Sequence, residues 1–184
     1  MSTFYQTSKI KSCHYDLLTQ AKPNSFVKTP QTIKVVLSFS SKDTSYNKLI
    51  GTSFALQLLT GLKPRVLTAK KAVTSLKIRK DSPIGCKLVL RGNQAENFLF
   101  KILFLAFPNI KTLEKLKLSK KIKTPQSFSF FVEDLLLFPE LESQYELFQN
   151  QKLPKLNVTL ISSAKSVPEL KTILMSLRYP LKSS

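Results

Sequence analysis

The sequence predicts an α+β fold: a single antiparallel-rich sheet with helices packed on one of its faces. Three observations lead to this prediction. The 184 residues suit one domain spanning 1–184, and 42% of them are hydrophobic, which is enough for a core. Several short segments are rich in β-branched residues or alternate apolar with polar residues, as strands do. Apolar segments with helical spacing lie before, between and after these strands.

The N-terminal part predicts a helix, a strand and a second helix. Residues 5–19 carry an imperfect apolar stripe, and residues 33–39 (IKVVLSF) form a β-branched strand. Residues 47–60 are predicted to be helical, and Gly61 suits the position that ends such a helix. Residues 66–68 form a short strand. The core side of the second helix is expected to carry Leu49, Ile50, Leu56 and Leu59.

The middle of the chain predicts a hairpin and a third helix. Residues 72–79 and 87–91 are interpreted as strands, and Pro and Gly in the connector 80–85 favour an ordered turn with a projecting tip. Asn93 or Asn97 is expected to cap a helix that continues through residue 107. Helical spacing favours core packing for its apolar residues Phe98, Leu99, Leu103, Phe104 and Phe107. Stacking on nucleic-acid bases is the alternative for Phe98, Phe100, Phe104 and Phe107.

The C-terminal part predicts two more strands and a last helix. Residues 111–124 form a second basic stretch, and residues 128–132 (FSFFV) are strand-like. Residues 155–162 alternate, which turns Leu156, Val158 and Leu160 inward. Pro168 suits the first turn of a helix that ends at residue 177.

Charge points to the class of partner. Twenty-nine Lys and Arg face 11 Asp and Glu, a formal net charge of +18. Between residues 61 and 108, basic residues alternate with short apolar runs, a pattern typical of strands that present a basic face to a polyanion. The sheet face opposite the helices is therefore predicted to face RNA. An anionic membrane surface and an acidic protein also fit the charge, but no apolar run reaches the roughly 20 residues of a membrane span.

Histidine and cysteine are too scarce for most catalytic or metal sites. His14 is the only histidine, so a Ser-His-Asp or Cys-His relay would depend on it. Its neighbours Cys13 and Asp16 would point to other faces of a helix, which favours a structural histidine. Cys13 and Cys86 are too few for a disulfide framework or a zinc site and are interpreted as reduced thiols.

Two carboxylate pairs could act as acid and base or hold Mg²⁺: Glu133 with Asp134, and Glu140 with Glu142. Neighbouring residues on a strand face opposite ways, so an acidic rim that keeps this side away from RNA is the preferred interpretation. Four glycines do not provide a phosphate-binding loop. The sequence thus predicts a protein that is not an enzyme, with no catalytic residue, metal or cofactor.

The order of short motifs along the chain is distinctive. GLKP at 61–64, Lys70-Lys71, SPIGCK at 82–87 and LRG at 90–92 occur in succession. FFVEDLLLFPEL, LNVTLISSAKS and LMSLRYPLK follow at 130–141, 156–166 and 174–182. This collinear series resembles the family of large-subunit ribosomal proteins that bind 5S rRNA, in its bacterial and organellar form.

The resemblance implies a structural component of the central protuberance of the large ribosomal subunit. It implies that a concave sheet face and its edges bind 5S and large-subunit rRNA, and that another surface reaches a small-subunit bridge protein. The rRNA-binding residues that it implies are Ser38, Lys63, Lys70, Lys71, Lys77, Arg79, Lys87 and Arg91. The implied loop that approaches the elbow of peptidyl-site tRNA consists of Lys80, Asp81, Ser82, Pro83, Ile84 and Gly85.

The chain departs from the family pattern at positions expected to contact 5S rRNA. Ser38, Leu62 and Val89 stand where the family usually has Asn, Gln and Thr. Hydroxyl or amide donors are thus lost at two positions and shortened at the third, which counts against the usual recognition of 5S rRNA. An AT-rich coding bias in the composition favours a mitochondrial ribosome over a plastid one. A free RNA-binding module or RNA chaperone, and a peripheral membrane protein, are the competing hypotheses.

Overall fold

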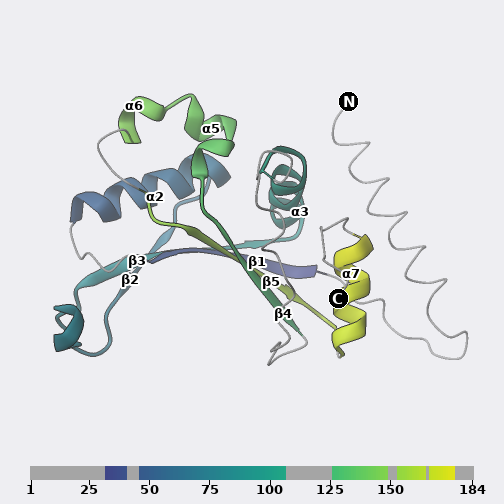
Figure 1. Ribbon diagram of the computed structural model, residues 1–184, viewed down its shortest axis with the longest axis horizontal. Helices are drawn as coiled ribbons and strands as arrows, with labels where there is room; N and C mark the ends of the chain where they lie inside the picture. Colours follow the sequence, from purple (N-terminus) through teal and green to yellow (C-terminus); the bar gives the residue numbers. More distant parts are fainter. Residues whose placement is uncertain (1–31, 41–45, 107–125, 149–152, 165, 177–184) are drawn as a thin grey trace, which may run out of the picture. The chain divides into compact units, whose positions relative to one another are not determined.

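The computed structural model describes residues 32–40, 46–106, 126–148, 153–164 and 166–176 (Figure 1). They belong to two compact units, of which the larger contains Lys34–Ile110 and Ser129–Leu160 and the smaller contains the rest. The predicted helix at 5–19 and the basic stretch at 111–124 lie outside the described residues. The two units are described separately below.

A five-stranded sheet has the order β2-β3-β1-β5-β4. Strand β3 pairs antiparallel with both β1 and β2, so that Arg91 lies opposite Lys34, and Lys87 lies opposite Ser38 and Arg65. The predicted strands at 33–39, 66–68, 128–132 and 155–162 are confirmed. The bounds of the strands are β1 Thr32–Ser40, β2 Arg65–Thr68, β3 Pro83–Arg91, β4 Ser127–Val132 and β5 Leu156–Ser162.

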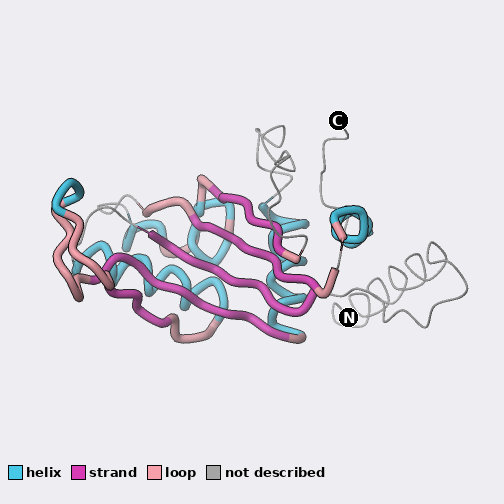
Figure 2. Tube along the Cα trace, turned by 90° about the horizontal axis from the view of Figure 1, so that it is seen from below, coloured by secondary structure: helices cyan, strands magenta, loops and turns pink. Residues whose placement is uncertain are grey.

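Helices of the larger unit lie on one side of its strands (Figures 1 and 2). They are α2 (Tyr46–Thr60), α3 (Asn93–Lys101), α5 (Pro139–Glu142) and α6 (Tyr145–Phe148). Short 3-10 turns form η1 (Thr74–Leu76) and η4 (Leu135–Leu137). The core between the helices and the strands is apolar and fully buried at Leu37, Phe39, Leu56, Leu59, Leu90, Phe138 and Leu141. The predicted α+β fold with helices on one face of an antiparallel-rich sheet is confirmed.

In the smaller unit, the backbone N–H of Ser162 donates to the carbonyl of Gln126 at 2.8 Å. Helix α7 (Val167–Ser176) begins beside Pro168, as predicted, and buries Leu170, Ile173 and Leu174.

Helix α2 confirms the predicted bounds within one residue and corrects one core residue. Gly61 follows the helix with a left-handed φ of 73°, and its N–H donates to the carbonyl of Gln57 at 2.7 Å. Leu56 and Leu59 are buried, but Ile50 is 64% exposed. Ile50 precedes Leu59 by nine residues, which places it on the opposite side of a helix with 3.6 residues per turn.

The predicted strand at 72–79 is wrong, and so are the bounds of the predicted loop. Residues 74–76 form the 3-10 turn η1, and a single bridge joins Val73 to Ile78. Strand β3 begins at Pro83, so Pro83, Ile84 and Gly85 belong to the sheet rather than to a loop tip. Gly85 is required by a close approach of two strands, because a Cβ there would overlap the carbonyl oxygen of Phe39.

Helix α3 continues as a π-helix over Ile102–Ala106, and its N-cap is Gly92 rather than Asn93 or Asn97. The widened turns rotate the later side chains relative to an α-helix, which explains why simple periodicity failed here. Phe98 and Leu99 are buried as predicted, whereas Phe104 is 60% exposed and stacks on Phe100 with ring centroids 5.9 Å apart. The prediction of core packing for Phe104 is therefore wrong.

This difference predicts unequal effects of truncating the two phenylalanines. Phe98 is 3% exposed, and its ring centroid lies 6.4 Å from that of Phe138, so Phe98→Ala is expected to cost roughly 3–5 kcal/mol of unfolding free energy. Phe104→Ala should cost less than about 1 kcal/mol because most of the ring is already in water. Urea unfolding of both variants measures the difference, and equal losses would show that Phe104 is packed in solution.

Candidate nucleic-acid interface

The strands leave one face without a covering helix among the described elements of the larger unit (Figure 2). In β3, Cys86, Leu88 and Leu90 point into the core, so the alternate residues Lys87, Val89 and Arg91 are exposed on this open face. Cross-strand register then assigns the residues opposite them to the same face. The open face therefore gathers four cations on three neighbouring strands: Lys34, Arg65, Lys87 and Arg91.

The other half of the open face, on β4 and β5, is neutral. The hydroxyls of Ser129 and Thr159 lie 3.0 Å apart across the two strands, and Phe131 is largely exposed beside them in β4. Asn157 alternates with the buried residues of β5 and so shares this face. Positive charge is thus concentrated on the β2-β3-β1 half, where it can meet a phosphate backbone.

A long hairpin between β2 and β3 carries a second group of cations. We call residues 69–82 the basic hairpin; Ala69 closes its base by donating to the carbonyl of Ser82 and accepting from the N–H of Asp81, both at 2.9 Å. Its end is the turn η1, which projects beyond the strands in Figure 2. The basic residues of the hairpin are all exposed: Lys70, Lys71, Lys77, Arg79 and Lys80.

The predicted site residues are therefore divided among three places. Ser38, Lys87 and Arg91 lie on the open face, and Lys63 lies exposed between α2 and β2. The members in the basic hairpin are Lys70, Lys71, Lys77, Arg79, Lys80, Asp81 and Ser82. Lys34 and Arg65 were not among the predicted site residues, although the alternation in 33–39 already places Lys34 and Ser38 on one face.

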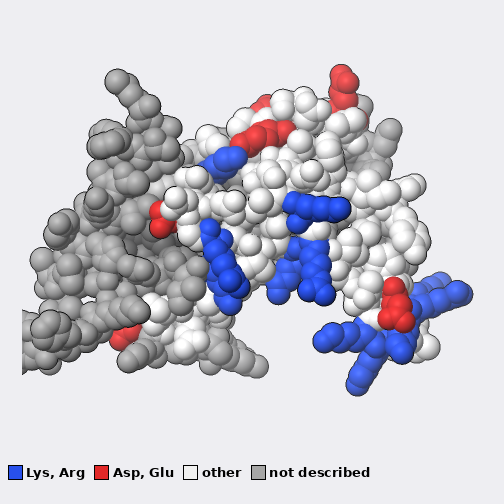
Figure 3. All heavy atoms as spheres, turned by 180° about the vertical axis from the view of Figure 1, so that it is seen from behind, with Lys and Arg blue, Asp and Glu red and all other residues white. Residues whose placement is uncertain are grey.

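Acidic side chains gather on the side of α5 and α6. Figure 3 shows the basic side chains along the lower side of the larger unit and around the hairpin at the lower right, with acidic side chains at the top. Residues 133–148 contain no Lys or Arg. Their carboxylates are Glu133, Asp134, Glu140, Glu142 and Glu146. The strands and the hairpin are thus the anion-binding side of this unit.

The interior of the larger unit offers little for catalysis. Cys86 is buried, and its thiol donates to the Thr52 hydroxyl at 3.3 Å. Burial raises the pKa of this thiol, against a smaller lowering by the Thr52 hydrogen bond, so it stays protonated at neutral pH. Among the described residues, no group of three His, Cys, Asp or Glu could hold a metal ion, and no helix is long and apolar enough to cross a membrane.

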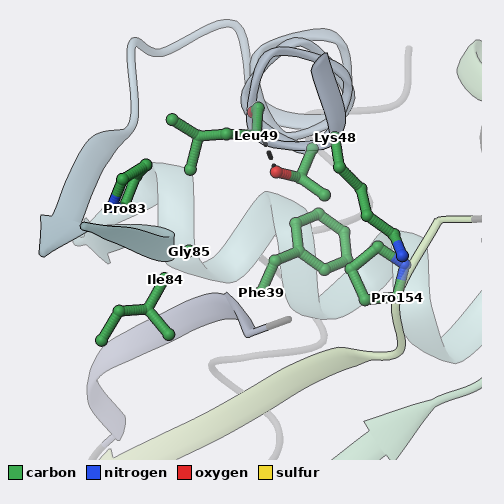
Figure 4. Close-up of a pocket in the computed structure, with 8 residues that line it drawn as sticks. Phe39, Lys48, Leu49, Pro83, Ile84, Gly85 and Pro154 are labelled. Carbon is green, nitrogen blue, oxygen red and sulfur yellow. Dashed lines mark hydrogen bonds between the residues drawn. The ribbon is translucent and has the colours of Figure 1, made fainter. Parts of the chain in front are cut away.

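A small hollow lies where α2 meets the ends of β1 and β3 (Figure 4). Lys48 and Thr52 are the polar side chains around it, and the Thr52 hydroxyl donates to the carbonyl of Leu49 at 2.9 Å. The hollow contains no acid–base pair, so we assign it no chemistry. Its lining residues are Phe39, Lys48, Leu49, Thr52, Pro83, Ile84, Gly85 and Pro154.

Comparison with known proteins agrees with a ribosomal protein of this architecture. Residues 83–181 match the C-terminal region of the ribosomal uL5 family. The large ribosomal subunit protein uL5m of Reclinomonas americana is 31% identical over 83% of each chain. The uL5 proteins of Borreliella afzelii and Chromobacterium violaceum are 29% and 28% identical over 100% and 97% of this chain, and 97% and 96% of theirs.

The fold and these matches define a structural protein of the ribosome, not an enzyme. The chain belongs to the family of the large-subunit ribosomal protein uL5. The resemblance carried by the motifs is thereby confirmed.

Proposed function

We propose that the chain is a structural constituent of the central protuberance of the large ribosomal subunit, where it binds 5S rRNA and large-subunit rRNA. The observation that supports this proposal is the one-sided distribution of charge. The cations of the open face and of the basic hairpin lie on one side, while residues 133–148 on the helix side carry only carboxylates as charged groups. Such a surface suits a phosphate backbone, whose contacts supply affinity without reading sequence.

The open face also suggests how 5S rRNA is contacted. Val89 lies opposite Val36, which leaves an apolar strip between the pair Lys34–Arg91 and the pair Ser38–Lys87. A valine cannot donate a hydrogen bond to a base or a ribose hydroxyl. We therefore expect 5S rRNA to be held mainly through phosphates by the cations on either side of this strip.

Sedimentation in sucrose at high salt tests the proposal with the full chain. A large-subunit protein should remain with large-subunit particles and with their rRNA after free RNA-binding proteins have dissociated. Recovery in a lighter ribonucleoprotein fraction would instead indicate a free RNA-binding module or RNA chaperone. Recovery in the membrane pellet would indicate a peripheral membrane protein.

We propose a mitochondrial ribosome as the location. The relative that is 31% identical is named as a mitochondrial-type protein, uL5m, although bacterial uL5 proteins are nearly as similar. Sedimenting the lysate of purified, protease-treated mitochondria would test this, because a matrix ribosome is protected there. Presence of the chain only in another compartment would contradict it.

The basic hairpin is proposed to approach peptidyl-site tRNA, and another surface to approach the small-subunit bridge. Five exposed cations on a backbone fixed at its base suit a sugar–phosphate surface more than a base edge. The real tip is Thr74–Lys77, where Lys77 has a left-handed φ of 54°. A contact of this kind would hold any tRNA rather than select one.

Shortening the basic hairpin should separate tRNA binding from assembly. Replacing residues 71–80 with Asn-Gly removes four cations and the turn, but keeps Ala69, Asp81 and Ser82 at the base. Large subunits should still incorporate the protein, and retention of peptidyl-site tRNA in filter-binding assays should fall. If incorporation itself fails while the isolated chain still folds, the hairpin serves the rRNA scaffold and the tRNA proposal is wrong.

A further inference from the structure

The outer side of α2 and the adjacent α6 form an exposed apolar surface. Tyr46, Ile50 and Phe54 follow one another at intervals of four residues and so lie on one face of α2. The rings of Phe54 and Phe148 have centroids 6.2 Å apart, which places α6 beside this stripe. We call this surface the α2–α6 face; its residues, each 40–71% exposed, are Tyr46, Ile50, Phe54, Tyr145 and Leu147.

The fold of the larger unit does not require these side chains. The opposite side of α2 already buries Ala55, Leu56 and Leu59 against the sheet. Single exposed apolar residues are ordinary on protein surfaces, but several in one stripe with aromatic members mark an interaction surface. Aromatic side chains are also the residues most enriched at the centres of protein–protein interfaces.

The charge beside this face selects the kind of partner. Glu142 and Glu146 are exposed in and next to α6, and neither forms an ion pair within the described part of the chain. Residues 133–148 contain five carboxylates without one Lys or Arg, in a chain whose formal net charge is +18. A phosphate backbone would be repelled here, whereas a polypeptide with apolar and basic side chains is complementary to both features.

We propose that the α2–α6 face binds a basic amphipathic segment of a neighbouring ribosomal protein. Apolar side chains of the segment lie on Ile50 and Phe54, and its Lys or Arg residues face Glu142 and Glu146. From Tyr46 to Phe54 the stripe is about 12 Å long at 1.5 Å per residue, which matches two to three turns of a docked helix. The inference extends the proposed function, because the partner is expected within the assembled large subunit.

A photo-crosslinking experiment tests this on assembled particles. A benzoylphenylalanine placed at Ile50 should crosslink, in purified large subunits, to a different protein whose crosslinked peptide is rich in Lys or Arg. The matched control is the same probe at Leu76, which is also exposed and apolar but lies at the tip of the basic hairpin. That probe should react with RNA rather than with the same protein.

Charge reversal provides the second arm. Glu142→Lys with Glu146→Lys should reduce the protein crosslink from Ile50 by roughly threefold or more and leave the Leu76 product unchanged. A crosslink from Ile50 to rRNA or to a second copy of this chain would overturn the inference, as would the absence of any crosslink in particles that contain the protein. An unchanged yield in the charge-reversal variant would also overturn it. If the chain is missing from large subunits, the proposed function fails first, and this inference fails with it.

Discussion

Gly85→Ala is expected to destabilise the larger unit by about 2–4 kcal/mol or to prevent its folding. An added Cβ would overlap the carbonyl oxygen of Phe39 and would lie 3.2 Å from the Cα of Ser40. Both are backbone atoms of β1, which pairs with β3 at this point, so no side chain can rotate away to relieve the clash. The two central strands would have to separate locally and lose part of their hydrogen bonding.

Gly61→Ala is the matched control. Gly61 has a φ of +73°, but nothing lies within 4 Å of the position that a Cβ would take. The control should therefore cost only about 1 kcal/mol, the strain of a left-handed alanine after a helix. Urea unfolding followed by circular dichroism compares the two variants. A midpoint for Gly85→Ala equal to that of the control would show that β1 and β3 do not approach as closely in solution.

Gly85 also shows where sequence reasoning reached its limit. Pro83 and Gly85 are turn-forming residues, and together they predicted a projecting tip at 80–85. A glycine is equally suited to a close approach between backbones, and only the partner strand distinguishes the two uses. That partner, Phe39, is far away in the sequence, so no local pattern could reveal the contact.

Strands were predicted well because their signal is local. In β5, Leu156, Val158 and Leu160 are buried while the residues between them are partly exposed, as the alternation indicated. The same rule applied to IKVVLSF places Lys34 on the open face, so this site residue could have been found from sequence. Arg65 could not, because its position depends on its register opposite Lys87 across a long connection. Phe104 was misassigned because the turns after Lys101 are π-helical, and no simple sequence pattern marks such turns.

Removing the four cations of the open face should weaken RNA binding strongly. The variant changes Lys34, Arg65, Lys87 and Arg91 to Gln, which keeps much of each side chain's length while deleting its charge. If each contacts one phosphate, affinity for 5S rRNA should fall by roughly 10²–10³-fold at moderate salt. The slope of log affinity against log salt should become shallower by about three to four units, at about 0.9 per phosphate.

The slope discriminates between a local interface and a general effect of net charge. Glu142→Gln with Glu146→Gln changes the net charge on the side of α5 and α6, away from the cations of the open face. If RNA is held on the open face, this control should leave the slope unchanged, although it makes the protein more positive. Fluorescence anisotropy over a series of KCl concentrations, with the full chain and a 5S rRNA transcript, measures both variants. A slope that responds to the acidic substitutions but not to the open-face substitutions would reverse the assignment of the RNA-binding side, because phosphate contacts must be lost where the cations are lost.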